Sequence, residues 1–257
     1  MSEVNDPIVV VPYIIKEEIK ELQDALSWKI PCEFWEDTGR IGSDLAYQYL
    51  WNKHKDRDVI ILHADMLPMP EDKNHKWFSD LLDTVNKYPE AGMFGMKLLY
   101  PEKINNKYII QHAGGRFNDD GEALHFGGGL NLFDGSTNGS LEEDAGQYDR
   151  TREVAWITMG GIYIKKSVRD SVGNFDPAFY WTYFRDVDYC LSARRAGFKI
   201  YQTGIPFLHF ESKDNKRLMA QNPALGEKWS INKEIFLEKW KESELLKTID
   251  KDVDIGE

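Results

Sequence analysis

The chain has 257 residues with a formal net charge of −11, and it is rich in apolar (42 %) and aromatic (13 %) residues. A chain of this length buries a substantial core, either as one large α/β domain or as two fused lobes. The acidic balance, 43 acidic against 32 basic residues, argues against a protein that binds nucleic acid or an anionic membrane surface.

Cysteine usage and hydropathy bear on the compartment. Cys32 and Cys190 lie far apart without metal-ligand spacing, which predicts buried free thiols in a reducing compartment. No apolar run approaches about 18 residues, and the first residues do not combine a basic with an apolar region. We therefore expect a cytoplasmic protein with no direct membrane span.

Short apolar runs alternate with amphipathic segments along the first hundred residues. Strands are expected at residues 8–11, 32–35, 59–62 and 93–95, and helices at 15–26, 45–50 and 77–85. Such alternation predicts a mostly parallel sheet with helices on both faces. Ligands of these sheets bind beyond the carboxyl ends of the strands, which here carry Pro12 and Tyr13, Glu36 and Asp37, and His63, Ala64 and Asp65.

The character of the chain changes near residue 100. Residues 131–149 are rich in Gly, Ser, Asn and acids, which predicts loops, and we expect residues 135–148 to form a lid. A strand is expected at 154–159, followed by Gly160 and Gly161, whose missing side chains allow close backbone approach. The tail is expected to be helical, with a frayed acidic end at 249–257.

Two carboxylates, Asp186 and Asp188, enter a helical pattern that Gly197 ends. The unpaired amides of a helix N-terminus favour negative charge, so these groups stay ionised. Aromatic residues precede them: Tyr180, Trp181, Tyr183 and Phe184. An ionised carboxylate in an aromatic cleft suits a general base, and the competing interpretation is an ordinary helix cap with core aromatics.

The ordered set of these segments resembles the family 2 glycosyltransferases with the GT-A fold, over roughly residues 8–242. It is most similar to bacterial and viral members that build rhamnose-containing and O-antigen-like glycans. The matching segments are residues 11–13, 36–37, 61–65, 111–115, 159–164, 172–176, 186–198 and 209–212. The resemblance implies an α/β GT-A fold: a Rossmann-like, mostly parallel sheet flanked by helices, with a smaller acceptor-side region and a helical C-terminal tail.

The resemblance also implies an activity, an inverting hexosyltransferase of polysaccharide biosynthesis. A sugar would move from a nucleoside-diphosphate donor to a hydroxyl of a glycan or lipid-linked glycan, which could bring the protein to a membrane peripherally. Residues 1–100 would bind the nucleotide sugar, residues 101–214 would bind the acceptor and carry the catalytic base, and residues 215–257 would form the tail.

The metal and the base follow from the matched positions. Asp65 and His209 would bind Mn²⁺ or Mg²⁺, which neutralises the leaving diphosphate. Asp186 would be the general base. On a helix Asp188 points about 200° away from it, so both cannot face one acceptor hydroxyl. Each assignment has a structural alternative: a turn cap for Asp65, a core histidine for His209 and a helix-terminal charge for Asp188.

Substrate contacts are implied for two further sets of residues. Pro12, Tyr13, Glu36, Asp37, His63, Ala64 and Asp65 would bind the nucleotide sugar, although a turn cap competes at Glu36 and Asp37 and a strand-end role at His63. His112, Trp156, Gly160, Gly161, Tyr180, Trp181, Arg185 and Asp188 would line the acceptor side. Plain core packing competes for each aromatic residue among them.

The sequence departs from the family pattern at two positions. His63 stands where the first aspartate of the DxD motif is expected, and Arg185 stands where a glutamate commonly precedes Asp186. Arg185 is expected to pair with a substrate phosphate or with Asp188. These departures leave open a catalytically idle carbohydrate- or nucleotide-binding module. A nucleotidyltransferase is disfavoured, because no Gly-rich basic loop follows the first strand.

Overall fold

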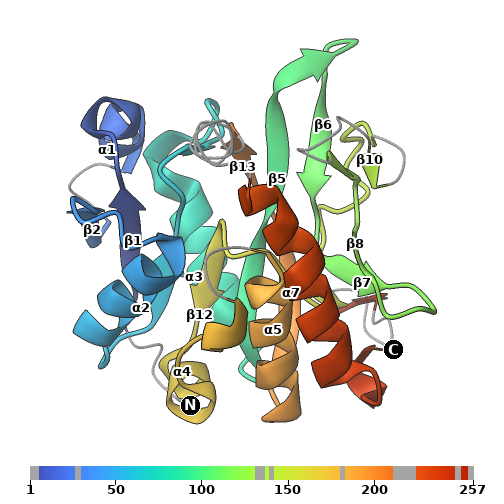
Figure 1. The fold of residues 1–257 in the computed structure, drawn as a ribbon. Coiled ribbons are helices and arrows are strands. Elements are labelled where there is room, and N and C mark those ends of the chain that lie inside the picture. Colours follow the sequence, from blue (N-terminus) through green and yellow to red (C-terminus); the bar gives the residue numbers. More distant parts are fainter. Residues whose placement is uncertain are drawn as a thin grey trace.

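The computed structural model describes residues 6–26, 30–130, 137–138, 142–179, 183–210, 224–246 and 250–253. Within these residues a 10-stranded sheet forms the centre, with its main path in the order β14-β11-β13-β5-β12-β3-β1-β2 (Figure 1). Two small two-stranded sheets lie beside it, β7 (Gly115–Phe117) with β8 (Ala123–His125), and β9 (Gly129–Leu130) with β10 (Thr137–Asn138).

The central sheet is mostly parallel, as predicted. Six strands run in one direction: β1 (Ile8–Tyr13), β2 (Cys32–Glu36), β3 (Val59–Ile61), β5 (Ala91–Ile104), β13 (Lys199–His209) and β14 (Asp250–Asp252). The antiparallel strands are β4 (Met66–Pro68), β6 (Lys107–His112), β11 (Arg152–Val154), which pairs with β14, and β12 (Ile162–Ile164).

Helices cover both faces of the sheet because alternate strand residues point to opposite sides. Ile8 and Val10 of β1 pack in one core with α2 (Ser43–Lys53), α4 (Lys166–Val172), α5 (Arg185–Arg195) and α7 (Ala224–Trp240). Val9 and Val11 pack in the other with α1 (Lys20–Leu26) and α3 (Lys76–Lys87). Short 3₁₀ segments lie at Lys16–Ile19, Lys73–His75, Pro177–Phe179 and Glu244–Leu246. The fold class predicted from the sequence is confirmed.

The topology brings the candidate residues to one edge. His63 and Asp65 follow β3, and His209 ends β13, which runs parallel to β3. Helix α5 precedes β13 and returns the chain to its start, so the N-terminus of α5, with Asp186, lies toward the carboxyl ends of these strands (Figure 1).

Two predicted elements are wrong in extent. The strand expected at 154–159 ends at Val154, and after an isolated bridge at Trp156 the chain re-enters the sheet as β12. The positive φ of Gly161, 70°, permits this turn. β5 extends to Ile104 because its far half pairs with β6 in a hairpin, which the loop-like composition beyond residue 100 did not reveal.

Other predictions fall wholly or partly outside the described residues. Tyr180 and Trp181 lie outside them, as do residues 215–223 of the tail and most of the expected frayed end. The expected lid is described only in part; within it, Asp144 pairs with the buried Lys97 of β5, which ties this segment to the sheet. Among the described residues, no helix has both the length and the hydropathy needed to cross a membrane.

Candidate functional site

His63, Asp65 and His209 meet at the carboxyl edge of the sheet, with ligand atoms that all lie within 4.8 Å of one another. The antiparallel pairing of β4 with β13 places His209 opposite Met66 and so brings it against the turn after β3. His209 Nε2 lies 3.3 Å from Asp65 Oδ1 and 3.4 Å from His63 Nδ1. Ligands with metal bonds of about 2.1 Å lie about 3–4 Å apart, so these spacings fit a shared cation.

Gln111 on β6 orients His209. Its Oε1 lies 2.6 Å from His209 Nδ1, and an amide oxygen only accepts, so Nδ1 carries the proton. The lone pair of Nε2 then faces the Asp65 carboxylate, which is also an acceptor. A cation shared between them, or a second proton on His209, satisfies this contact. Metal-binding histidines are commonly held through their other nitrogen in this way, and the sequence did not single out Gln111.

The surroundings keep His63 and Asp65 unprotonated. Burial, followed by the nearby His209, lowers the pKa of His63 to about 4. Burial alone would raise the pKa of Asp65, but the hydrogen bond and charge of His209 lower it to about 2. His63 Nε2 is buried and has no hydrogen-bond partner in the part of the chain that the structure describes. The His63 imidazole and the Asp65 carboxylate therefore offer lone pairs beside His209.

A second pair of histidines, His112 and His125, packs behind this cluster. The sequence interpretation did not single out His125. The Thr158 N–H donates to His112 Nε2 at 3.3 Å, so the His112 proton is on Nδ1 and is donated to His125 Nδ1 at 2.9 Å. Trp156 packs against both rings, and its indole N–H donates to the Arg116 carbonyl. His112 and Trp156 are 1 % and 2 % exposed, so direct contact of either with an acceptor does not fit this conformation.

Gly160 and Gly161 make room for two side chains that follow β3, His63 and Met66. A Cβ at Gly160 would lie 3.0 Å from ring atoms of His63, and one at Gly161 would lie 2.9 Å from the Met66 methyl. The expected close approach is therefore present, but it involves His63 and Met66. Ala64 lies between His63 and Asp65 and packs against the core.

The nucleotide-side residues lie at the ends of neighbouring strands. Pro12 and Tyr13 of β1 are paired with Trp35 and Glu36 of β2. Partial burial, and then the Glu36 carboxylate, raise the pKa of Tyr13, which hydrogen-bonds to that carboxylate.

Asp37 has a different environment from Glu36, which is exposed. Asp37 is only 4 % exposed, and its carboxylate accepts hydrogen bonds from the Ile41 and Gly42 amides at 3.0 and 3.3 Å. Asp37 is therefore the turn cap that the sequence left as the alternative.

Asp186 lies in the first turn of α5 and is half-buried. Its Oδ1 accepts the Val187 N–H at 2.9 Å. One turn later Cys190 contacts the Ile157 backbone, which places this face of α5 against the chain leading to Gly160. Burial raises the pKa of Asp186, although Arg185 opposes the shift. Within the described residues no direct contact joins Asp186 to the cluster of His63, Asp65 and His209.

Arg185 does not pair with Asp188. It forms a buried ion pair with Asp44 in the first turn of α2, and its guanidinium lies 5.7 Å from the Tyr47 ring. Tyr47 in turn stacks on His63 with ring centroids 5.9 Å apart. Asp44 and Tyr47, which the sequence did not single out, therefore connect the start of α5 to the cluster.

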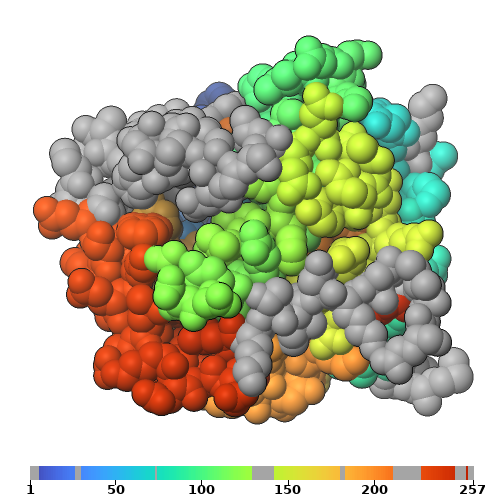
Figure 2. Space-filling view, turned by 90° about the vertical axis from the view of Figure 1, so that its right-hand side faces the viewer, coloured from blue at the N-terminus to red at the C-terminus, as the bar shows by residue number. Residues whose placement is uncertain are grey.

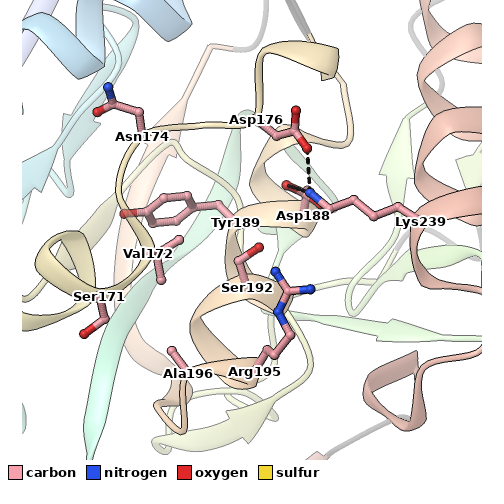
Figure 3. Close-up of a pocket in the computed structure, with 10 residues that line it drawn as sticks. All are labelled: Ser171, Val172, Asn174, Asp176, Asp188, Tyr189, Ser192, Arg195, Ala196 and Lys239. Carbon is pink, nitrogen blue, oxygen red and sulfur yellow. Dashed lines mark hydrogen bonds and ion pairs between the residues drawn. The ribbon is translucent and has the colours of Figure 1, made fainter.

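Asp188 faces an open cleft of about 320 Å³ on the other side of α5 (Figure 3). It is 3 % exposed and accepts a hydrogen bond from the Trp240 indole N–H at 2.8 Å. Lys239 reaches between it and Asp176, at 2.8 and 2.7 Å (Figure 3). The carboxylate therefore anchors α7, and the site proposed below excludes Asp188.

Comparison with known proteins agrees with this architecture. No protein-family model matches the chain. A crystal structure of GalNAc-T7 with UDP, GalNAc and Mn²⁺ is similar over 81 % of this chain and 44 % of that one, with a TM-score of 0.53 at 14 % identity. The chain has a GT-A fold. At this identity the likeness shows the fold alone.

Two further matches add no functional information. The uncharacterized protein y4gI of Sinorhizobium fredii (strain NBRC 101917 / NGR234) is 29 % identical over 140 residues, which are 53 % of this chain and 14 % of that protein. A197 from STIV matches with a TM-score of 0.46 and 14 % identity, over 79 % of this chain and 85 % of that one. The chain thus spans less than half the length of y4gI and of the GalNAc-T7 chain.

Proposed function

We propose that this protein is a metal-assisted, inverting glycosyltransferase that moves a sugar from a nucleoside-diphosphate donor to a hydroxyl of a glycan or lipid-linked glycan. The observation that carries the proposal is the convergence of His63, Asp65 and His209 at the carboxyl edge of a GT-A sheet. The GalNAc-T7 structure contains UDP, GalNAc and Mn²⁺, and this supports the same donor class and a divalent ion here.

The donor atoms fit a divalent cation held by His63, Asp65 and His209. A set of two imidazoles and one carboxylate suits Mn²⁺ better than Mg²⁺, which prefers oxygen ligands. When bound, the ion would neutralise charge on the leaving diphosphate. His63 would thus replace the first aspartate of the DxD pattern as a ligand. Its Nε2 is buried without a hydrogen-bond partner among the described residues, which supports a ligand-binding role for the imidazole.

Asp186 is proposed as the general base. As the acceptor oxygen attacks the anomeric carbon, Asp186 would take the hydroxyl proton, and the bond to the diphosphate would break with its electron pair leaving on the diphosphate. Its half-buried environment supports this role, because desolvation raises the pKa of Asp186 and a raised pKa makes the carboxylate a better base. Arg185, held by Asp44, would orient the first turn of α5 rather than bind a phosphate.

We further propose that residues 1–100 bind the donor and residues 101–214 the acceptor, with residues 215–257 as a tail. The nucleotide would lie beyond β1 and β2, against Pro12, Tyr13 and Glu36, with Asp37 holding the turn. Tyr180 and Trp181 stay predicted acceptor contacts, since they lie outside the described residues.

A panel of nucleotide sugars, tested with Mn²⁺, Mg²⁺ or EDTA, checks this proposal. We expect one donor to be hydrolysed or transferred with Mn²⁺ stimulation. Asp186→Asn should abolish turnover while retaining nucleotide binding, and Asp65→Ala should weaken nucleotide binding only when metal is present. If the wild type and Asp186→Asn behave identically toward every donor, the protein is instead a binding module of the same fold.

A further inference from the structure

Helix α7 presents an exposed tryptophan beside the start of α5. Trp229 is 40 % exposed, and its ring centroid lies 6.0 Å from that of Phe184, with an interplanar angle of 54°. Phe184 packs inward on Phe236, with centroids 5.3 Å apart. The indole is therefore supported from below by core aromatics while much of its surface faces solvent.

This aromatic pair lies next to the proposed base. Phe184 is the residue before α5, and Asp186 follows it by two positions. Tyr183 and Phe184 have backbone φ values of 64° and 63°, which residues other than glycine rarely adopt. Contacts with the surrounding structure must therefore hold this turn. Asn232 on α7, 2 % exposed, donates from Nδ2 to the Tyr183 carbonyl at 3.2 Å. One helix thus both carries Trp229 and fixes the turn before Asp186.

The charges around Trp229 are balanced. Lys233, one turn further along α7, lies 5.1 Å from the Trp229 ring centroid and forms an ion pair with Glu122. Glu122 belongs to the turn between β7 and β8, and this hairpin, in green, lies against α7 in Figure 2. An exposed indole rimmed by a neutralised ion pair suits a ligand with an apolar face and uncharged polar edges.

We propose that Trp229 and Phe184 form a stacking surface for a neutral pyranose ring of the acceptor glycan, beside Asp186. A pyranose matches the site because its C–H face packs on an aromatic ring while its hydroxyls hydrogen-bond at the edges. This inference rests on the proposed function, and it assigns an acceptor-binding role to the C-terminal tail that the sequence interpretation treated as core packing.

Saturation-transfer NMR with three simple sugars tests the surface. The probes are methyl α-rhamnopyranoside, methyl β-galactopyranoside and methyl N-acetyl-β-glucosaminide, each added to the full chain. We expect ring protons of at least one probe to receive saturation from the wild type. Trp229→Ala should remove the signal, or weaken binding about tenfold, the size expected of one lost aromatic contact. Trp229→Phe should retain it in part.

Ile231→Ala is the matched control, since Ile231 is 44 % exposed on the same helix but points about 200° away. It should bind the probe like the wild type. Equal signals from Trp229→Ala and the wild type would overturn the inference, as would a wild type that binds none of the three sugars. Mn²⁺-stimulated turnover of a nucleotide sugar, and its loss in Asp186→Asn, decide the proposed function separately: if turnover is found while Trp229→Ala has no effect on sugar binding, only this inference fails.

Discussion

The pair of the buried His112 and the half-buried His125 should make the fold sensitive to acid, and His125 allows this to be measured. Burial lowers the pKa of His125 from 6.5 to about 4. As pH falls below 6.5, the unfolded chain takes up a proton at this position while the folded protein does not. The unfolded state is therefore favoured progressively, and the free energy of unfolding falls between pH 6.5 and about 4.

The structure sets the size of this effect. A pKa difference of this size corresponds to about 3 kcal/mol over the whole window, or a slope of about 1.4 kcal/mol per pH unit for one histidine. A typical domain is stable by about 5–15 kcal/mol, so one such group removes a substantial share. The pKa of His112 is lowered in the same direction, by burial and then by His125 and His209, so the effects of the pair reinforce each other.

Urea unfolding of the metal-free protein at pH 7.0, 6.0, 5.5 and 5.0 tests the reasoning with two variants. His125→Gln keeps an acceptor for the His112 Nδ1–H, whereas His125→Ala does not. Both should lower the pH slope by about 1.4 kcal/mol per pH unit, because both remove the same titrating group. Only the alanine variant should lose a further amount of about 1–3 kcal/mol in the free energy of unfolding at every pH, because it leaves the His112 donor unpaired. A slope that stays at the wild-type value in both variants would refute the assignment of a neutral His125.

Three further predictions concern the proposed site. Gln111→Leu should weaken Mn²⁺ binding about 10–100-fold, because His209 loses the acceptor that orients it; an unchanged Mn²⁺ titration would count against this role. Asp186→Asn should raise the midpoint of thermal unfolding at pH 7 while turnover is lost, since burial raises the pKa of Asp186 and its charged form destabilises the fold above that pKa; a lower midpoint would contradict this. Asp188→Ala should cost about 1–3 kcal/mol by leaving the Trp240 N–H unpaired, yet leave kcat nearly unchanged; a collapse of kcat at intact folding would return Asp188 to the site.

The sequence could predict the elements whose signal is local. The β-branched runs and their alternation with amphipathic segments predicted the parallel strands and the helices that cover them. Because the carboxyl ends of parallel strands share an edge, the motif ending in Asp65 was expected near this edge. The proximity of Asp65 and His209 is present in the structure, and their role as metal ligands stays a prediction.

The partners of these residues could not be predicted, because they depend on packing between distant segments. Gln111 reaches His209 only through the pairing of β6 with β5 and of β5 with β13. Arg185 meets Asp44 because α2 and α5 pack on the same face of the sheet. Nothing in the sequence near Arg185 marks a residue of α2 as its partner. The structure gives Asp44 in place of the expected Asp188, and the alternative pairing with a substrate phosphate stays untested.

The two carboxylates of α5, of which the sequence interpretation chose Asp186 as the base, have different environments in the structure. Asp186 and Asp188 are two residues apart, so they lie on opposite sides of one helix. Asp188 accepts a hydrogen bond from Trp240 and forms an ion pair with Lys239, and through these two contacts the carboxylate anchors α7. Asp186 is described with one local hydrogen bond to Val187, and its burial is unfavourable to its charge. A half-buried carboxylate whose pKa is raised by its environment, and which anchors no other element in the part of the chain that the structure describes, is the better candidate for chemistry.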